Sequence, residues 1–544
     1  MRWAESQGRA MADTVQLVEE TLRDGQLSLW ATRMDTRTML GIAGTIDKIG
    51  FQRACISSGA AFDTAIRFLR EDPWERFRLL RAEMPRTPLE FLVRGRNLIG
   101  WKRYPDDVAA LTLRCLRRAG FDWMLIFDGL NDYRNIAFHV RCAKKEGLKV
   151  SAFISYADSP VHTDEYWIRK TRELVALGVD VVNFGDPAGL LSAARVRALV
   201  PALLAAIDGR AELLVNIHTS TGQALDCYGE ALRGGARALA SAALPLANSE
   251  SIPATADVIS LAHAQGLEVD LDERLVAEVD AYFAYVALRD GRPTGKPIKY
   301  DEQDYKRYLG HQIPGGMMSN FVRQHREAGT LDRLPEILEE MGRVRAELGF
   351  PPMVTPWSQL VGVQATLNVT SGVRYGTVPD ELKLYARGSY GELPAPIDPN
   401  VLDRMLAGGS AAPIDPGAGD GESVLPRIRA QNPFVSDEEL MLRIFYDENT
   451  LDGYRKGLKP LDPLSVAKTP LSSLIEAGLR GASRGSLVVK IPDAAPPLAY
   501  ADVVHAATAL QAAESSAQIA LSTPAYSLSV GRAPGAGAVE KSTG

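Results

Sequence analysis

The stretch VDVVNFGDPAGLL, residues 179–191, decides the fold of this chain. Its first half, VDVVNF, is a short run rich in valine, which is typical of a strand buried in a parallel sheet. The run leads into a loop that begins at Gly185 and Asp186, and the helical pattern AARVRALVPALLAAI follows. A buried strand, a short loop and an amphipathic helix form the repeating unit of a parallel α/β fold.

The same alternation of short β-rich runs and helical patterns extends outward over residues 15–288. Eight strands and eight crossovers in this length predict a (β/α)8 TIM barrel rather than an open doubly wound sheet. No G-x-G-x-x-G and no Walker-type loop follows a strand, so the sequence lacks the usual nucleotide-binding signatures. The expected strands are residues 15–21, 51–57, 88–93, 122–127, 148–154, 179–184, 211–217 and 236–242, of which the second has the weakest pattern.

The pattern changes to helices after the barrel. We expect a mostly helical domain over residues 289–404 that completes the active site, and a flexible, glycine-rich linker over residues 405–425. A helical segment over residues 426–480 and a partly disordered C-terminal extension over residues 481–544 follow.

Composition narrows the class of function. The chain has 544 residues, 46% of them hydrophobic, and a formal net charge of -6, so it has no basic field for nucleic acid. The four cysteines form no CxxC pair, which argues against a zinc ribbon or a disulfide framework and fits a cytoplasmic protein. The longest apolar run is too short to span a membrane. Small molecules and protein partners are the expected ligands.

In a TIM barrel the chemistry lies at the carboxyl ends of the strands, because the loops that follow the strands line that mouth. The polar residues at or just after the expected strand ends are therefore candidates for the site. They are Arg23, Asp24, Arg94, Asp128, Asn131, Gly185, Asp186, Asn216 and His218.

Eight motifs occur in order along the chain. They are ETLRDGQLSLWATR, EDPWERFRLLRAEMP, LVRGRNLIGW, IFDGLNDYRN, ISYADSPVHTDEYW, GDPAGLL, HQIPGGMMSN and VTPWSQLVGVQA. Together they resemble the carboxyltransferase subunits of biotin-dependent enzymes, such as the pyruvate carboxylase carboxyltransferase domain, the oxaloacetate decarboxylase alpha subunit and the transcarboxylase subunit that handles oxaloacetate. The resemblance covers residues 15–461 and implies a 2-oxo acid substrate, a homodimer and biotin on a separate carrier. It implies as partners a biotin carboxyl carrier protein and a biotin carboxylase subunit, because the chain has no biotinyl-lysine segment and no ATP-grasp domain.

The resemblance also implies a divalent metal held by an aspartate after strand 1, a carbamylated lysine after strand 6 and two histidines after strand 7. Asp24 matches the aspartate, but the lysine falls on Gly185. The histidine positions fall on Asn216 and His218, so only the second histidine is kept. Two strong ligands and one amide are a poor metal cage, so the sequence favours loss of this metal. An oxygen-rich magnesium or manganese site completed by Asp186 is the alternative.

The positions for carboxyl transfer are only partly kept. Arg94 matches the arginine that binds the keto acid, and a rim ion pair is its alternative role. Gln26 takes the place of the family histidine and Leu27 that of the glutamine, and we assign Gln26 and Asp128 with Arg94 to the substrate site. Ser319 matches the hydroxyl that relays a proton between substrate and biotin, with a helix N-cap as its alternative role.

Three functional hypotheses follow. The first is a carboxyltransferase subunit that moves a carboxyl group between a biotin carrier and a pyruvate- or oxaloacetate-like carbonyl acceptor. The second is a biotin-independent lyase or aldolase-like enzyme that uses the same barrel mouth. The third is a noncatalytic subunit of a carboxylase complex. The retained arginine and hydroxyl favour the first hypothesis.

Overall fold

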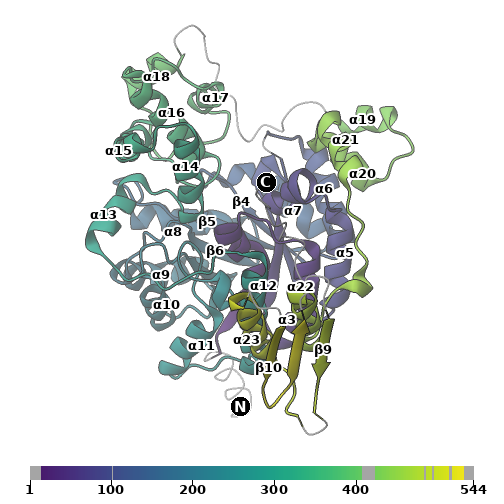
Figure 1. The fold of residues 1–544 in the computed structure, drawn as a ribbon. Helices are drawn as coiled ribbons and strands as arrows, with labels where there is room; N and C mark the ends of the chain where they lie inside the picture. The colour runs from purple at the N-terminus through teal and green to yellow at the C-terminus, as the bar shows by residue number, and fades with distance from the viewer. Residues whose placement is uncertain are drawn as a thin grey trace, which may run out of the picture.

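The predicted TIM barrel is confirmed by the computed structural model, in which β1 to β8 form one closed, all-parallel barrel (Figure 1). The structure describes residues 14–100, 102–406, 423–482, 486–492, 495–513 and 518–531, without the side chains of Ser319 and Asn320. All eight expected strands are present, the second included. They are β1 Gln16–Glu19, β2 Arg53–Ser58, β3 Leu89–Val93, β4 Trp123–Phe127, β5 Lys149–Ser155, β6 Val181–Asp186, β7 Glu212–Ile217 and β8 Ala238–Ser241.

Strand ends differ from the expected ones at the mouth of the barrel. β1 stops at Glu19, and the chain then forms a π-helical turn, η1 (Thr21–Gly25), that runs directly into α2 (Gln26–Trp30). A Cβ atom on Gly25 would lie 2.9 Å from the carbonyl oxygen of Leu246, so the turn packs too closely for a side chain there. At the other side of the barrel, Gly185, Asp186 and Asn216 lie inside β6 and β7 rather than after them.

Helices surround the barrel because each has one apolar face. In α9, for example, Ser192 caps the first turn by accepting a hydrogen bond from the Arg195 amide, and Val196, Leu199 and Val200 are buried against the strands. The helices are α3 Thr36–Ile49, α4 Gly59–Thr64, α5 Pro73–Glu83, α6 Asp106–Arg118, α7 Ala137–Lys145, α8 Asp164–Ala176, α9 Ala193–Ile207, α10 Ala224–Arg233, α11 Thr255–Ala264 and α12 Glu273–Asp290.

A second group of helices with its own apolar core lies beyond the carboxyl ends of the strands, with α14 nearest the barrel (Figure 1). Trp357, Met341 and Tyr385 are among the buried residues of that core. Residues 407–422, most of the expected linker, lie outside the described residues. The helices are α13 Glu302–His311, α14 Gly315–Glu327, α15 Leu334–Glu347, α16 Trp357–Ser371, α17 Asp380–Ala386 and α18 Pro399–Leu406.

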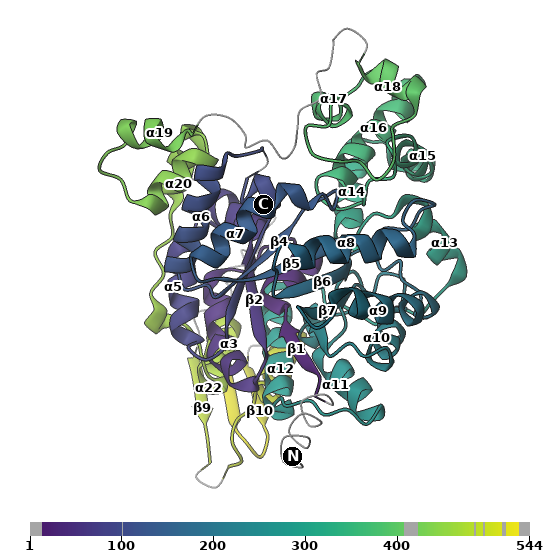
Figure 2. The same cartoon turned by 180° about the vertical axis from the view of Figure 1, so that it is seen from behind.

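The C-terminal elements lie in two places (Figures 1 and 2): α19, α20 and α21 lie near α6 on the side of the barrel mouth, whereas α22, α23 and a small sheet lie toward the opposite end. Within the extension for which we expected partial disorder, the structure describes a three-stranded antiparallel sheet of order β10-β11-β9 and a helix, α23, that packs on α12. In the part of the chain described, no helix is long and apolar enough to span a membrane. The elements are α19 Leu425–Gln431, α20 Asp437–Phe445, α21 Glu448–Gly457, α22 Pro470–Ala482, β9 Ser486–Lys490, α23 Tyr500–Ala512, β10 Gln518–Ser522 and β11 Ser527–Gly531.

Candidate active site

One cavity of about 700 Å³ opens at the mouth of the barrel and brings together five of the expected site residues. Arg23 and Asp24 come from η1, Arg94 follows β3, Asn216 lies in β7 and His218 follows it. Its size is in the usual range for small-molecule sites. The cavity is therefore the candidate active site.

Asp24 and His218 form a hydrogen-bonded pair at the floor of the cavity. The Nε2 atom of His218 lies 3.0 Å from Oδ2 of Asp24, and its Nδ1 atom lies 2.6 Å from the carbonyl oxygen of Glu250. Burial alone would lower the pKa of His218, but the Asp24 carboxylate outweighs it, so that pKa is raised above its ordinary value. Both ring nitrogens face acceptors, which favours the imidazolium form.

Arg23 is the second cation on Asp24. Its Nη1 atom lies 3.0 Å from Oδ1 of Asp24, so each oxygen of that carboxylate contacts one positive group. Burial would raise the pKa of Asp24, but Arg23 and His218 hold it well below its ordinary value. Asp24 is thus a carboxylate under all ordinary conditions and fixes the orientation of the histidine.

Arg94 lines the same cavity from the loop after β3. Its Nη2 atom donates to the carbonyl oxygen of Ile99 at 2.7 Å, which anchors the half-buried side chain. Burial lowers the pKa of Arg94 to about 10, so the guanidinium stays charged at neutral pH. A fixed guanidinium in a partly dry cavity suits the carboxylate or carbonyl oxygen of a small acid.

The position of the family lysine is filled by an aromatic ring. A Cβ atom on Gly185 would lie only 1.7 Å from Cζ of Phe153, whose side chain lines the cavity from β5. The two strands are neighbours in the barrel, with Ser155 paired to Gly185. A side chain at position 185 therefore cannot enter the cavity unless the Phe153 ring moves.

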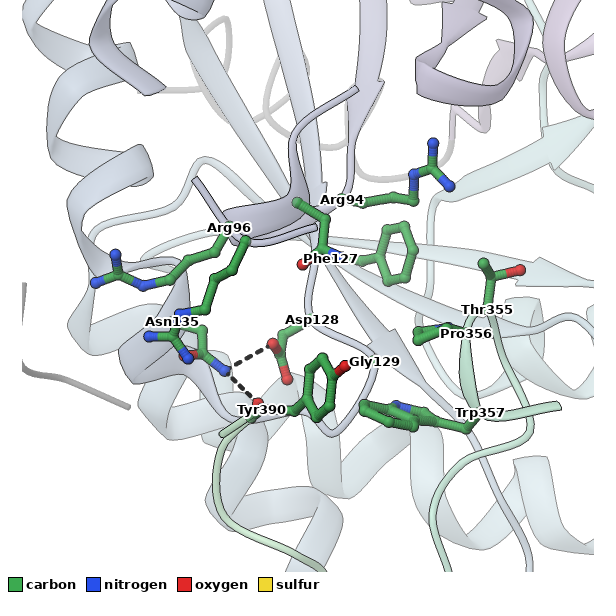
Figure 3. Close-up of a pocket in the computed structure, with 12 residues that line it drawn as sticks. Arg94, Arg96, Phe127, Asp128, Gly129, Asn135, Thr355, Pro356, Trp357 and Tyr390 are labelled. Atoms are coloured by element: carbon green, nitrogen blue, oxygen red, sulfur yellow. Dashed lines mark hydrogen bonds between the residues drawn. The ribbon is translucent and has the colours of Figure 1, made fainter. Parts of the chain in front are cut away.

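Asp128 does not line this cavity and lies instead in a smaller pocket beside it (Figure 3). Its carboxylate accepts hydrogen bonds from the Leu130 and Asp132 amides and from Nδ2 of Asn135, each at 2.9 Å. Asn135 also donates to the carbonyl oxygen of Tyr390, which ties the loop to the helical domain. Burial raises the pKa of Asp128 to about 6. This geometry gives Asp128 a loop-ordering role and does not support our expectation of direct substrate binding.

Gln26 is turned away from the cavity. Its Nε2 atom donates to the carbonyl oxygen of Leu22 at 2.6 Å, and its Oε1 atom accepts from the Met34 amide at 3.0 Å. The next residue, Leu27, lines the cavity instead. The geometry therefore does not support our expectation that Gln26 binds substrate, because both polar groups of its amide are used to hold the backbone of the loop.

Comparison with known proteins gives the family. Residues 309–470 match a family described as a conserved carboxylase domain. The chain is 40% identical over 408 residues to a pyruvate carboxylase subunit of Methanothermobacter thermautotrophicus, and the match covers 74% of this chain and 69% of that protein. It is 35% identical to the 2-oxoglutarate carboxylase large subunit of Hydrogenobacter thermophilus, over 72% of this chain and 60% of the relative. The chain belongs to the biotin-dependent carboxyltransferase family.

A solved structure agrees with the family assignment. The carboxyl transferase domain of Rhizobium etli pyruvate carboxylase superimposes with a TM-score of 0.75 at 26% identity, and the match covers 85% of this chain and 79% of that domain. The barrel and the helices beyond its mouth are therefore the shared framework of this carboxyltransferase family.

The metal site that the family resemblance implies does not fit the residues present. Asp24 and His218 remain, but Asn216 offers only a neutral amide, and the Phe153 ring fills the space of the lysine. Asp186 does not replace it, because its Oδ2 atom accepts from the Leu191 amide at 2.7 Å and the residue does not line the cavity. Divalent zinc sites use three or four nitrogen, sulfur or carboxylate donors. Among the described residues at this site, the chain offers two, Asp24 and His218.

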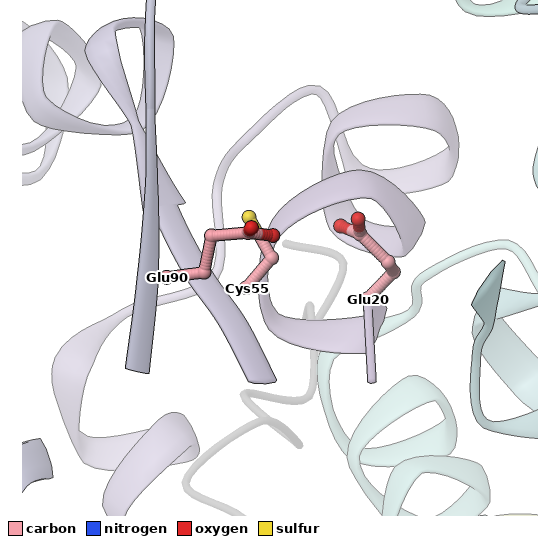
Figure 4. A group of neighbouring side chains, drawn as sticks. All are labelled: Glu20, Cys55 and Glu90. Atoms are coloured by element: carbon pink, nitrogen blue, oxygen red, sulfur yellow. The ribbon is translucent and has the colours of Figure 1, made fainter. Parts of the chain in front are cut away.

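A different group of donors lies within the barrel. Among the described residues, only the side chains of Glu20, Cys55 and Glu90 form a set of three or more possible ligands within 4.8 Å of one another (Figure 4). Arg23 lies 2.8 Å from Glu20 and Arg53 lies 3.1 Å from Glu90, so both carboxyl groups already have cationic partners. Burial raises the pKa of Glu20 to about 8 and that of the Cys55 thiol well above its ordinary value. The cluster is buried, and each of its two carboxyl groups contacts an arginine through one oxygen.

Ser319 lies in α14, and its side chain is outside the described residues. It is the fifth residue of a helix that begins at Gly315, so it is not the N-cap of that helix. Gly316, Met317 and Arg323 of the same helix line the cavity. The role of Ser319 in proton transfer remains a prediction.

Several cavity residues were not predicted from the sequence. Phe153 lies inside a strand, where an aromatic residue is ordinarily part of the core. Its neighbour Gly185 was the available clue, since a lost lysine leaves a volume that another side chain must fill. The cavity is also lined by three arginines that the sequence did not predict, Arg33, Arg292 and Arg323.

Proposed function

We propose that this chain transfers a carboxyl group between biotin on a separate carrier protein and a 2-oxo acid. The observation that carries this proposal is the single cavity that Arg94 shares with the Asp24–His218 pair at the barrel mouth. Two relatives support the substrate class, because they are named for the carboxylation of pyruvate and of 2-oxoglutarate.

In the proposed reaction Arg94 binds the carboxylate of the 2-oxo acid. The bond between N1 of carboxybiotin and its carboxyl carbon breaks, which releases CO2 inside the cavity. A proton leaves the carbon next to the acceptor carbonyl and moves to N1 of biotin, with Ser319 as the proposed relay. The enolate carbon then attacks CO2 and forms the new carbon–carbon bond. The reverse sequence decarboxylates the carboxylated acid.

The partners follow from the same proposal. A biotin carboxyl carrier protein presents biotin to the cavity, and a biotin carboxylase subunit carboxylates it. We also propose that the chain works as a homodimer in the cytoplasm. Co-purification of a biotinylated protein with the tagged chain from its native host, detected with streptavidin, is the expected outcome.

The direct test is decarboxylation of oxaloacetate by the purified chain. Pyruvate release should depend on added biotin or biotinylated carrier and should be lost in Arg94→Gln. Arg96→Gln is the matched control, because Arg96 lies two residues away and lines the smaller pocket instead. If no 2-oxo acid in a panel gives biotin-dependent carboxyl exchange, the proposal is wrong.

The Asp24–His218 pair also suits a second function, a biotin-independent lyase that stabilises an enolate with the same groups. A retro-aldol or decarboxylation activity that persists with avidin present would favour this alternative. Loss of all activity on avidin treatment would favour carboxyl transfer.

A further inference from the structure

We propose that the barrel mouth of this chain works without a divalent metal, and that Arg94, with the other arginines of the cavity, supplies the positive charge beside the substrate in place of that metal. The inference rests on the proposed function for its chemistry, but the metal-free state of the cavity is tested separately from activity.

The first step of the argument is the volume of the lost lysine. In the family that side chain would run from strand 6 into the cavity, but here a Cβ atom on Gly185 would already lie 1.7 Å from Phe153 Cζ and 2.2 Å from its Cε2 atom. An aromatic ring cannot coordinate a divalent cation, and protein interiors leave no room for both groups. The absence of a lysine at position 185 and the presence of the Phe153 ring in its space are therefore two parts of one change in the cavity.

The second step is the number of donors. No set of three histidine, cysteine or carboxylate ligands that includes Asp24 or His218 forms among the residues that the structure describes. Asp24 contacts Arg23 and His218 at 3.0 Å each, and His218 is held by the Glu250 carbonyl on its other nitrogen. A divalent ion would have to displace these contacts and would gain only two strong ligands in return.

The third step is the charge that faces a bound acid. Of the described residues that line the cavity, five are arginines and only two, Asp24 and Asp63, carry carboxylates. Both ring nitrogens of His218 already contact acceptors, Oδ2 of Asp24 and the Glu250 carbonyl oxygen, so the arginines are the groups that can face the acid. One preorganised hydrogen-bond donor that faces a developing oxyanion is worth about 10²–10³ in kcat, so a fixed guanidinium group such as that of Arg94 can take over the task of a Lewis acid.

Metal analysis of the purified protein by mass spectrometry is the first test. We expect far less than one zinc, manganese, cobalt or magnesium ion per chain, and biotin-dependent activity that is unchanged after dialysis against EDTA. Near-stoichiometric metal whose removal lowers the activity and whose return restores it would overturn the inference.

Thermal unfolding gives a readout that needs no activity. Addition of zinc or manganese chloride should not raise the Tm of the natural chain or of His218→Asn. A Tm increase in the natural chain that disappears in His218→Asn would contradict the inference. A metal-induced increase that depends on Cys55, and is lost in Cys55→Ser but kept in His218→Asn, would place the ion in the buried cluster and support a metal-free cavity.

A variant in which the metal ligands of the family are restored is the positive control. The triple variant Phe153→Ala, Gly185→Lys, Asn216→His restores the family donors and should gain a metal-dependent Tm increase, while Phe153→Leu alone should not. If the natural chain lacks carboxyl-transfer activity but is metal-free, the proposed function fails and the cavity inference stands. If activity is present and depends on a bound metal, the proposed function stands and the cavity inference fails.

Discussion

Arg94 depends on its surroundings for its position. The Ile99 carbonyl oxygen accepts from its Nη2 atom at 2.7 Å, and Gly59 lies so close that a Cβ atom there would be 3.2 Å from the same nitrogen. The guanidinium points away from Asp128 in Figure 3, so that carboxylate does not compete for it. A planar guanidinium group at this position can donate two parallel hydrogen bonds to the two oxygens of one carboxylate.

Replacement of Arg94 by lysine should therefore be costly although the charge is kept. The ammonium group cannot make two parallel hydrogen bonds, and a lost charged hydrogen bond is worth roughly 1.5–3 kcal/mol, or about 10- to 100-fold in kcat/KM. Steady-state kinetics of biotin-dependent oxaloacetate decarboxylation should show this loss in Arg94→Lys. Arg96→Lys should stay near the natural value, and an equal loss in both variants would contradict a specific role for Arg94.

Glu19 gives a pH dependence to the stability of the barrel. Burial raises its pKa to about 7, although its Oε1 atom accepts from the Thr21 amide at 2.7 Å. The folded state thus keeps a proton that the unfolded chain releases above its ordinary pKa of 4.5. The stabilising contribution is complete below that ordinary pKa and is lost as the pH rises through about 7.

In Glu19→Gln this part of the pH dependence should disappear, because the amide does not titrate. The free energy of unfolding of the natural chain should fall relative to the variant by roughly 3 kcal/mol between about pH 5 and pH 8. Urea unfolding at several pH values measures the difference between the two proteins, which removes the contribution of other titrating groups. Parallel curves would show that Glu19 does not bind the extra proton.

At the scale of elements, the strands were the most predictable part. Buried parallel strands are short apolar runs, and β4, β5 and β7 begin and end within one residue of the expected positions. The π-helical turn η1 was not predictable from periodicity, because it depends on the close approach of Gly25 to Leu246. That turn leads directly into α2, in which Leu27 and not Gln26 lines the cavity.

The sheet of β9, β10 and β11 was missed for a different reason. Its strands alternate less exposed and more exposed residues over only five positions each, and the sequence around them is rich in alanine, glycine and serine, which resembles a flexible tail. Pairing of β9 with β11 joins residues about forty positions apart, and only the three-dimensional structure reveals such a contact. In the same way, the filling of the lysine position by the Phe153 ring could be seen only once β5 and β6 were placed side by side.

The packing of β5 against β6 makes a direct prediction. In Gly185→Ala the added methyl group meets the Phe153 ring, so the variant should lose about 1–3 kcal/mol of stability. In a Phe153→Ala background the same substitution should cost almost nothing, which gives a large coupling energy between the two sites. Urea unfolding of the four proteins in this cycle measures the coupling. Additive effects would show that the ring does not occupy the lysine volume.

At the scale of the whole molecule, the parts that pack around the barrel have different tasks. The helical domain and the strand ends form the cavity, whereas α23 packs on the outside of α12 and the small sheet lies toward the opposite end of the barrel (Figure 1). Residues at the amino-terminal end of a TIM barrel generally contribute to stability and those at the carboxyl end to chemistry. The effects of substitutions in α23 and in the sheet should therefore be separable from activity.

Val503 and Val488 offer a matched pair for this test. Val503 of α23 is fully buried, whereas Val488 of β9 is 48% exposed. Val503→Ala should lower the free energy of unfolding by roughly 2 kcal/mol, since it removes two buried methyl groups and leaves a cavity, and Val488→Ala should change it by less than about 0.5 kcal/mol. Because the mouth of the barrel is formed by other elements, neither variant should alter KM or kcat for biotin-dependent decarboxylation at a temperature where both are folded. A kinetic defect in Val503→Ala under those conditions would mean that the packing of α23 on α12 is coupled to the cavity, and the division of tasks between these parts of the molecule would then be wrong.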